Sequence, residues 1–123
     1  MAKQNTQSLY WTFFARIDPM LLEDEVVKEV GEAQWVQGAE LIGRGGATGL
    51  LVVTDKAVLM ELDSDGTRVR LARQQISNPR KSWIVMPNFN EVHFGYLHEN
   101  LQPFELSFYC TKRLARGIIR ELQ

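Results

Sequence analysis

The stretch from Gly49 to Leu62, GLLVVTDKAVLMEL, most constrains what this chain can fold into. Its first half, Leu50 to Val53, is apolar throughout, whereas its second half, Ala57 to Leu62, alternates between two faces. The polar step Thr54-Asp55-Lys56 between the halves is typical of a tight turn. The pattern predicts two strands joined as a hairpin, which is how the core of a sheet begins.

Composition limits the class of protein. The chain has 123 residues, of which 45% are hydrophobic and 24% charged, as in one ordinary globular domain with its own core. Cys110 is the only cysteine, which excludes a disulfide framework and a cysteine-based zinc cluster. No apolar run approaches the roughly 18 residues of a membrane span, and the N-terminus lacks a signal-peptide pattern. We therefore expect a cytoplasmic protein without a transmembrane segment.

Aromatic residues are dense near the N-terminus. The four that crowd into five positions are Tyr10, Trp11, Phe13 and Phe14. On a helix over 9–17, Phe13 would share a face with Leu9 and Ile17, and Phe14 would lie on the neighbouring face. Such a segment has to be covered. We favour packing against its own domain, and the alternative is a contact with a protein partner, a second copy or a membrane surface.

The next segment carries helix signals. Asp18 and Pro19 are typical of an N-cap and a first helical position. Acidic residues at 23–25 suit the first turns of a helix, and Gly31 is a plausible stop. The pattern predicts a helix over 18–31 and a further turn over 32–36. Residues 1–37 would then be an N-terminal helical extension packed on the domain.

From Gly38 onward the pattern changes to short strands with period-two alternation. The predicted strands are residues 39–44, 50–53, 57–62, 67–71, 83–86, 91–98 and 104–108. Thr111 then caps an amphipathic helix that runs to about Leu122. Residues 38–123 therefore form the main domain, in which Gly117 is explained by close packing of the helix on the sheet.

This order of elements resembles the pleckstrin-homology-like fold, and more specifically a GRAM-type or bacterial pleckstrin-homology domain. The resemblance lies in Gly49 to Leu59. In the family's hairpin pattern a glycine is followed by apolar residues, then by Thr, then by Asn or Asp, and then by Lys or Arg. Two further features add to the resemblance. A short connection runs from Leu71 to Ile76, and the aromatic residues Phe104 and Phe108 stand in the strand before the last helix. The resemblance covers residues 38–122.

The resemblance implies a mainly β, α+β fold: an antiparallel barrel of about seven strands closed by the C-terminal helix. It also implies a binding module rather than a catalyst. Such folds share a frame and differ in ligand, so the fold alone does not identify the partner. Phosphoinositide-binding members place several basic residues in the first hairpin loop, whereas residues 43–49 here carry only Arg44.

The residues that carry chemistry do not assemble into a catalytic or metal site. The glycine-rich residues 43–49 are followed by an apolar strand pattern, which favours a flexible loop over a phosphate-binding loop. His93 and His98 lie five residues apart on one predicted strand and would point to opposite faces. Cys110 is expected to be a buried structural thiol. We expect no enzyme, no metal and no cofactor.

A basic run is the strongest functional hint. Its members are Arg68, Arg70, Arg73, Arg80 and Lys81, followed by Trp83, and no acidic residue falls between Gly66 and Asn90. Basic side chains interleaved with aromatics can bind nucleic acid or anionic lipid. The favoured alternative is a solvated strand face whose arginines pair with the acidic N-terminal helix.

These patterns together predict a non-catalytic module for binding or assembly. Its contact would be with a protein partner or with itself as a homo-oligomer, through Tyr10, Trp11, Phe13 and Phe14. The alternative is binding of an anionic ligand, a lipid headgroup or, less favoured, nucleic acid, through Arg44 and the strip from Arg68 to Lys81.

Overall fold

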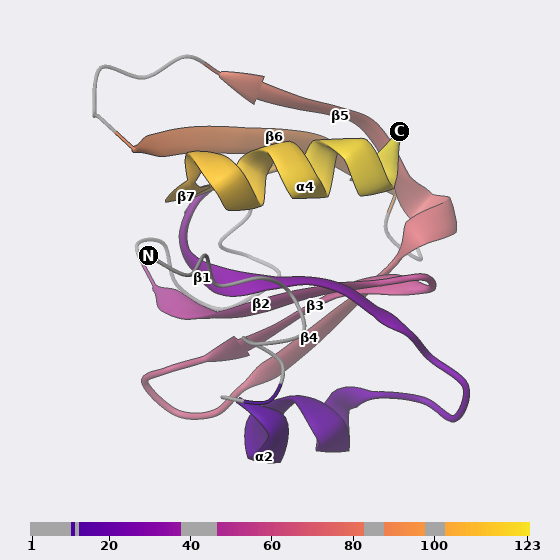
Figure 1. Cartoon of the computed structure of the whole chain (residues 1–123). Coiled ribbons are helices and arrows are strands. Elements are labelled where there is room, and N and C mark those ends of the chain that lie inside the picture. The colour runs from indigo at the N-terminus through magenta and orange to yellow at the C-terminus, as the bar shows by residue number, and fades with distance from the viewer. Residues whose placement is uncertain (1–10, 12, 38–46, 83–87, 98–102) are drawn as a thin grey trace.

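The computed structural model describes residues 11, 13–37, 47–82, 88–97 and 103–123. Seven strands and one long helix make up the body of the domain (Figure 1). The elements are α2 (Phe14–Ile17), η1 (Asp18–Met20), β1 (Val27–Gln37), β2 (Thr48–Thr54), β3 (Ala57–Leu62), β4 (Arg68–Ala72), η2 (Arg73–Gln75), β5 (Ile76–Ser82), β6 (Phe89–Leu97), β7 (Pro103–Thr111) and α4 (Lys112–Leu122). The expected strands over 39–44 and 83–86 lie outside the described residues.

The seven strands form a single antiparallel sheet in the order β4-β3-β2-β1-β7-β6-β5. No pairing joins β4 to β5 among the described residues, so the sheet is not closed into a barrel. The expectation of a closed barrel is therefore wrong, while a seven-stranded antiparallel sheet and a C-terminal helix are confirmed. Two of these strands, β1 and β5, are not among those that the sequence predicts. The sheet bends at its middle, and α4 lies against β1, β5, β6 and β7 (Figure 1).

The predicted hairpin is confirmed as β2 and β3, which pair in register from Gly49–Leu62 to Val53–Val58. Both faces of this hairpin are buried. Val58 and Met60 face the main core, which α4 covers, whereas Ala57 and Leu59 face a second core. Ile17 belongs to the second core, so α2 lies on the opposite side of the hairpin from α4 (Figure 1).

Residues 18–31 are not a helix, contrary to the sequence prediction. Only the three residues of η1 are helical, and β1 begins at Val27. β1 pairs with β2 along Val27–Gln34 and with β7 along Gln34–Gln37, so it joins the two halves of the sheet. The further turn expected over 32–36 is also part of this strand. The small helical part of the N-terminal segment is α2 and η1.

The alternation of side chains explains the strand at residues 27–37, and Gly31 explains how closely α4 packs over it. Its second half alternates, with Ala33 and Trp35 buried and Glu32, Gln34 and Val36 exposed. This period of two is the signature of a strand. Gly31 does not end a helix but lies under α4. A Cβ added there would come within 2.4 Å of the Leu114 side chain, so glycine lets α4 pack closely over the strand.

The C-terminal prediction holds in detail. Val92, Phe94 and Phe108 are buried in the main core, as the alternation of β6 and β7 predicts. The Thr111 hydroxyl accepts a hydrogen bond of 3.2 Å from the Leu114 amide and caps α4. Gly117 faces Glu29 of β1, and a Cβ there would lie 2.5 Å from the carboxyl group at the end of that side chain, so α4 passes close to β1 at this point.

Candidate functional site

The N-terminal segment has one face anchored to the body. The Phe13 side chain packs against the second core, and Ile17 is buried within it. Arg16 donates to Glu61 Oε1 at 2.6 Å and to Asp63 Oδ1 at 3.0 Å. Positions 13, 16 and 17 share one side of a helical turn, so this side faces the protein. The favoured expectation, packing on its own domain, is confirmed for Phe13.

The other face of this segment is exposed and aromatic. Trp11 is 63% exposed and Phe14 is 41% exposed. Their rings stack with centroids 5.8 Å apart and an angle of 24° between the ring planes. Two of the predicted contact residues therefore form one exposed surface, which we call the aromatic pair. Tyr10 lies outside the described residues.

The predicted basic strip has ion-pair partners at β4. Arg68 Nε lies 3.0 Å from Glu61 Oε2 across the β3–β4 pair. Arg70 Nη2 lies 2.7 Å from Glu25 Oε2, and Arg70 also donates to the Met20 carbonyl at 3.3 Å. The expected pairing of an arginine with an acidic N-terminal residue is thus confirmed for Arg70, although Glu25 does not lie in a helix.

These contacts change the pKa values of the two carboxyls. Burial alone would raise the pKa of Glu61, but hydrogen bonds and charge attraction from Arg16 and Arg68 outweigh burial and lower it. Burial would likewise raise the pKa of Glu25, and hydrogen bonds from Arg70, Thr54 and the Leu22 amide lower it instead. Both carboxyls are therefore held in their charged form.

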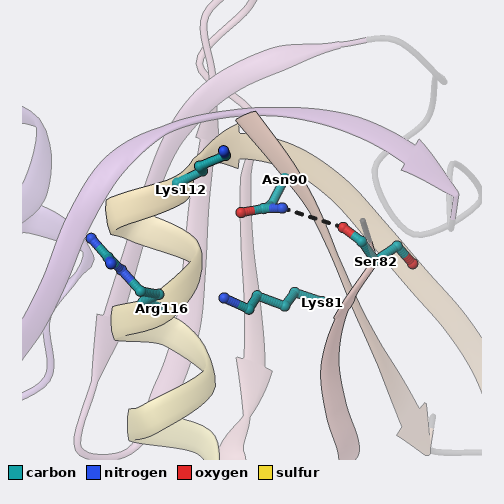
Figure 2. Close-up of a pocket in the computed structure, with 5 residues that line it drawn as sticks. All are labelled: Lys81, Ser82, Asn90, Lys112 and Arg116. Carbon is teal, nitrogen blue, oxygen red and sulfur yellow. Dashed lines mark hydrogen bonds between the residues drawn. The ribbon is translucent and has the colours of Figure 1, made fainter. Parts of the chain in front are cut away.

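The other residues of the strip contact different parts of the protein. Arg73 donates to the carbonyls of Thr54 and Glu121, and Arg80 pairs with Glu105. Lys81, at the end of β5, points instead toward α4 (Figure 2). The structure thus distributes the strip over several partners rather than one surface. Arg44 and Trp83 lie outside the described residues.

A pocket of about 270 Å³ lies between the end of β5, the start of β6 and the first turns of α4. The residues that line it are Lys81, Ser82, Asn90, Lys112 and Arg116 (Figure 2). We call it the cationic pocket, because three of these side chains are positively charged. The sequence prediction missed Lys112 and Arg116, although their spacing of four residues places them on one side of α4.

The groups considered for catalysis and metal binding are placed as follows. Cys110 is only 2% exposed, and burial raises the pKa of its thiol to about 12, which confirms a buried structural thiol. His93 lies 3.5 Å from Glu91 and 3.8 Å from Glu105, and His98 lies outside the described residues. In the described part of the chain, no three His, Cys, Asp or Glu side chains come together as metal ligands.

No helix among the described residues has the length and hydropathy that crossing a bilayer requires.

Comparisons with known proteins give structural neighbours only. No family model matches the chain, and no curated protein matches its sequence. The C-terminal domain of an unknown protein from Leishmania infantum superposes with a TM-score of 0.62 at 12% identity, covering 93% of this chain and 97% of that domain. The hSac2 domain of the human phosphoinositide phosphatase Sac2 superposes with a TM-score of 0.59 at 13% identity, covering 98% of this chain and 83% of that one.

At such low identity the likeness concerns the fold alone. The coarser part of the expected resemblance is supported, since the hSac2 domain has a pleckstrin-homology-like sheet fold. The finer assignment to a GRAM-type family is not confirmed. The chain thus shares its fold with the Leishmania infantum domain and the hSac2 domain.

Proposed function

We propose that this protein is a non-catalytic binding module on a pleckstrin-homology-like, GRAM-type scaffold, and that it self-associates through the aromatic pair. The observation that carries the proposal is the exposed stack of Trp11 on Phe14. A large exposed aromatic surface is disfavoured in water and is typical of a contact site. Arg16 and Ile17 anchor α2, the short helix that carries Phe14, to the body of the domain.

A second copy of the chain is the partner that would cover this aromatic surface on both molecules at once. In a two-fold symmetric contact the same patch occurs on both chains, so each aromatic pair is covered by the other. Burying the exposed parts of the two rings is worth on the order of 5 kcal/mol per chain. Association costs roughly 4–15 kcal/mol in lost freedom, so a weak, concentration-dependent dimer is expected.

The experiment is sedimentation equilibrium over a concentration series from micromolar to millimolar. We expect the apparent mass to rise from the 14.1 kDa of one chain toward twice that value. The variant Trp11→Ser with Phe14→Ser should stay at the mass of one chain. The matched control is Phe89→Ser with Leu97→Ser, which removes two exposed apolar side chains from β6, 39% and 42% exposed, and should associate as the wild type does.

A wild-type chain that keeps the mass of one chain at every concentration would contradict the proposal. Equal association of the two double variants would contradict it as well, because the contact would then lie elsewhere. The alternative, anionic-ligand binding through Arg44 and the strip from Arg68 to Lys81, stays a prediction. Its paired arginines make it the weaker of the two.

A further inference from the structure

The backbone of β4 is open along one side. Just before β4, the Leu62 amide donates to the Thr67 carbonyl at 2.8 Å. Just after it, the Arg73 amide donates to the Lys56 carbonyl at 3.0 Å. Bonded and non-bonded residue pairs alternate along two antiparallel strands, so these two bonds determine which residues of β4 bond to β3. The residues of β4 whose amides and carbonyls point away from β3 are Arg68, Arg70 and Ala72.

None of the described residues bonds to these open backbone groups. Such a row of amides and carbonyls is a template for a further strand. The other end of the sheet is protected, because in β5 Pro79 has no amide hydrogen and Asn78 has a φ of 51°. A register shift also interrupts β5 between Ser77 and Arg80. Of the two end strands, β4 is therefore the one that can accept a partner strand.

The charged side chains of β4 do not block this edge. Charges on an edge strand commonly prevent pairing, but Arg68 lies 3.0 Å from the Glu61 carboxylate. Arg70 likewise lies 2.7 Å from the carboxylate of Glu25. Arg70 is opposite Leu59 of the second core in the β3–β4 pair, so both arginines lie on that face of the sheet. The arginines of β4 therefore leave no uncompensated charge at the edge.

A second copy of the chain is the strand donor that fits this edge best. Two identical edges pair antiparallel about a two-fold axis perpendicular to the sheet, so the two N-terminal segments come to lie on the same face. This segment packs over β3 and β4, where Arg70 donates to the Met20 carbonyl at 3.3 Å and Arg16 binds Glu61. One axis can therefore serve both the β4 edges and the aromatic pairs. The aromatic pair alone supports only a weak dimer, and strand pairing adds backbone hydrogen bonds.

Charge selects the register of this pairing. A two-fold axis at Arg70 would place Arg70 opposite itself in the partner subunit, and an axis at Val69 would place it opposite Arg68. Like charges directly opposite each other are destabilising. An axis at Leu71 places Arg70 opposite Ala72 of the partner subunit and keeps the arginines of β4 apart. Leu71 belongs to the main core, so the two Leu71 side chains then meet on the main-core face.

We propose that two copies of this chain pair antiparallel through β4, about an axis at Leu71, and join their two sheets into one. The inference rests on the proposed self-association and assigns to it a second contact besides the aromatic pair. In this register Arg70 and Ala72 exchange backbone hydrogen bonds with Ala72 and Arg70 of the partner subunit. Arg68 lies beyond the end of the partner's strand and has no bond across the contact.

Ala72→Pro tests the pairing, with sedimentation equilibrium over the same concentration series. Ala72 has a φ of −64°, the value that proline imposes, and its amide does not bond to β3, so proline fits the chain and removes only an edge donor. We expect association to weaken about tenfold or more, since each copy loses one hydrogen bond across the contact. The matched control Ala72→Ser keeps the amide and should associate as the wild type does. Neither variant should lower the unfolding midpoint of the dilute protein.

Amide hydrogen exchange of the wild type, followed by NMR, tests the register. The Arg70 and Ala72 amides should exchange more slowly at high than at low protein concentration, because pairing protects them. The Arg68 amide is the internal control and should exchange equally fast at both concentrations.

The outcomes separate this inference from the proposed function. Full association of Ala72→Pro, or exchange of the Arg70 and Ala72 amides that does not depend on concentration, would overturn the β4 contact. If Ala72→Pro associates fully while Trp11→Ser with Phe14→Ser does not, the aromatic contact stands and the β4 contact falls. The reverse result supports the β4 contact and removes the aromatic one.

Discussion

Gly49 occupies a position on β2 where no side chain fits. A Cβ there would lie 2.4 Å from the backbone oxygen of Glu61 and 2.9 Å from the methyl carbon of Met60. The oxygen belongs to the partner strand β3 and cannot turn away. We expect Gly49→Ala to lower the free energy of unfolding by about 3 kcal/mol, at the upper end for overpacking. Urea denaturation followed by circular dichroism measures it.

Gly95→Ala is the matched control, a glycine-to-alanine change in another strand of the same sheet. There the nearest atom is the Ser77 hydroxyl oxygen at 2.7 Å, at the end of an exposed side chain that can rotate. We expect a loss below about 1 kcal/mol. If the two variants lost equal stability, the close approach of the β3 backbone would not be the reason for glycine at position 49.

At the scale of elements, the turn Thr54-Asp55-Lys56 does more than connect β2 to β3. The Thr54 hydroxyl accepts hydrogen bonds from the Lys56 and Ala57 amides, at 3.1 and 3.0 Å, and donates to Glu25. The Asp55 carboxylate accepts from the Val26 amide at 2.8 Å. The turn therefore also holds the segment that leads into β1.

Thr54→Val tests this role, because valine keeps the shape of the side chain and removes the hydroxyl. Each buried group left without its partner costs ~1–3 kcal/mol, so we expect a total loss of about 3 kcal/mol or more. Thr54→Ser keeps the hydroxyl, removes one buried methyl and should lose about 1 kcal/mol. Thermal unfolding of the two variants separates them. A larger loss in the serine variant would assign the residue to packing instead.

At the scale of the whole molecule, two carboxylates tie the N-terminal segment to the sheet. Glu61 on β3 binds Arg16, and Glu25 in the segment before β1 binds Arg70 on β4. The anchored segment covers the second core, which contains Val30, Leu50 and Val52. The electrostatic pairs and the burial of this core are therefore coupled.

This coupling predicts a loss of stability in acid. The pKa values of Glu25 and Glu61 in the folded protein lie below the ordinary glutamate value of 4.5. Their contribution to stability is therefore complete above pH 4.5 and is lost as the pH falls through the folded-state pKa values. Glu25→Gln should lower stability near neutral pH and make it less dependent on pH below 4.5. Urea midpoints across this range measure both effects.

Glu23→Gln is the control for that series, since it removes an exposed carboxyl from the same segment. It should leave both the neutral stability and the acid dependence close to those of the wild type. An acid dependence of Glu25→Gln as steep as that of the wild type would show that the ion pair with Arg70 is not its source.

Local patterns determined much of this protein from the sequence alone. The hairpin of β2 and β3, the inward residues of β6 and β7, and the capped helix α4 all follow from periodicity over a few neighbouring residues. The aromatic pair could also be anticipated, because Trp11 and Phe14 are close in sequence. Such patterns show which side of a helix or strand is buried and which side is exposed.

The tertiary structure alone decided the features that depend on distant residues. Val27 and Val30 fit a helical stripe as well as a strand, and pairing with β2 made them part of β1. The partner of each arginine also depended on folding, which brought Glu25 to Arg70 and the carbonyls of Thr54 and Glu121 to Arg73. Ion-pair partners and neighbouring strands are set by contacts between residues that are far apart in the sequence. The periodicity of a short stretch carries no information about such contacts.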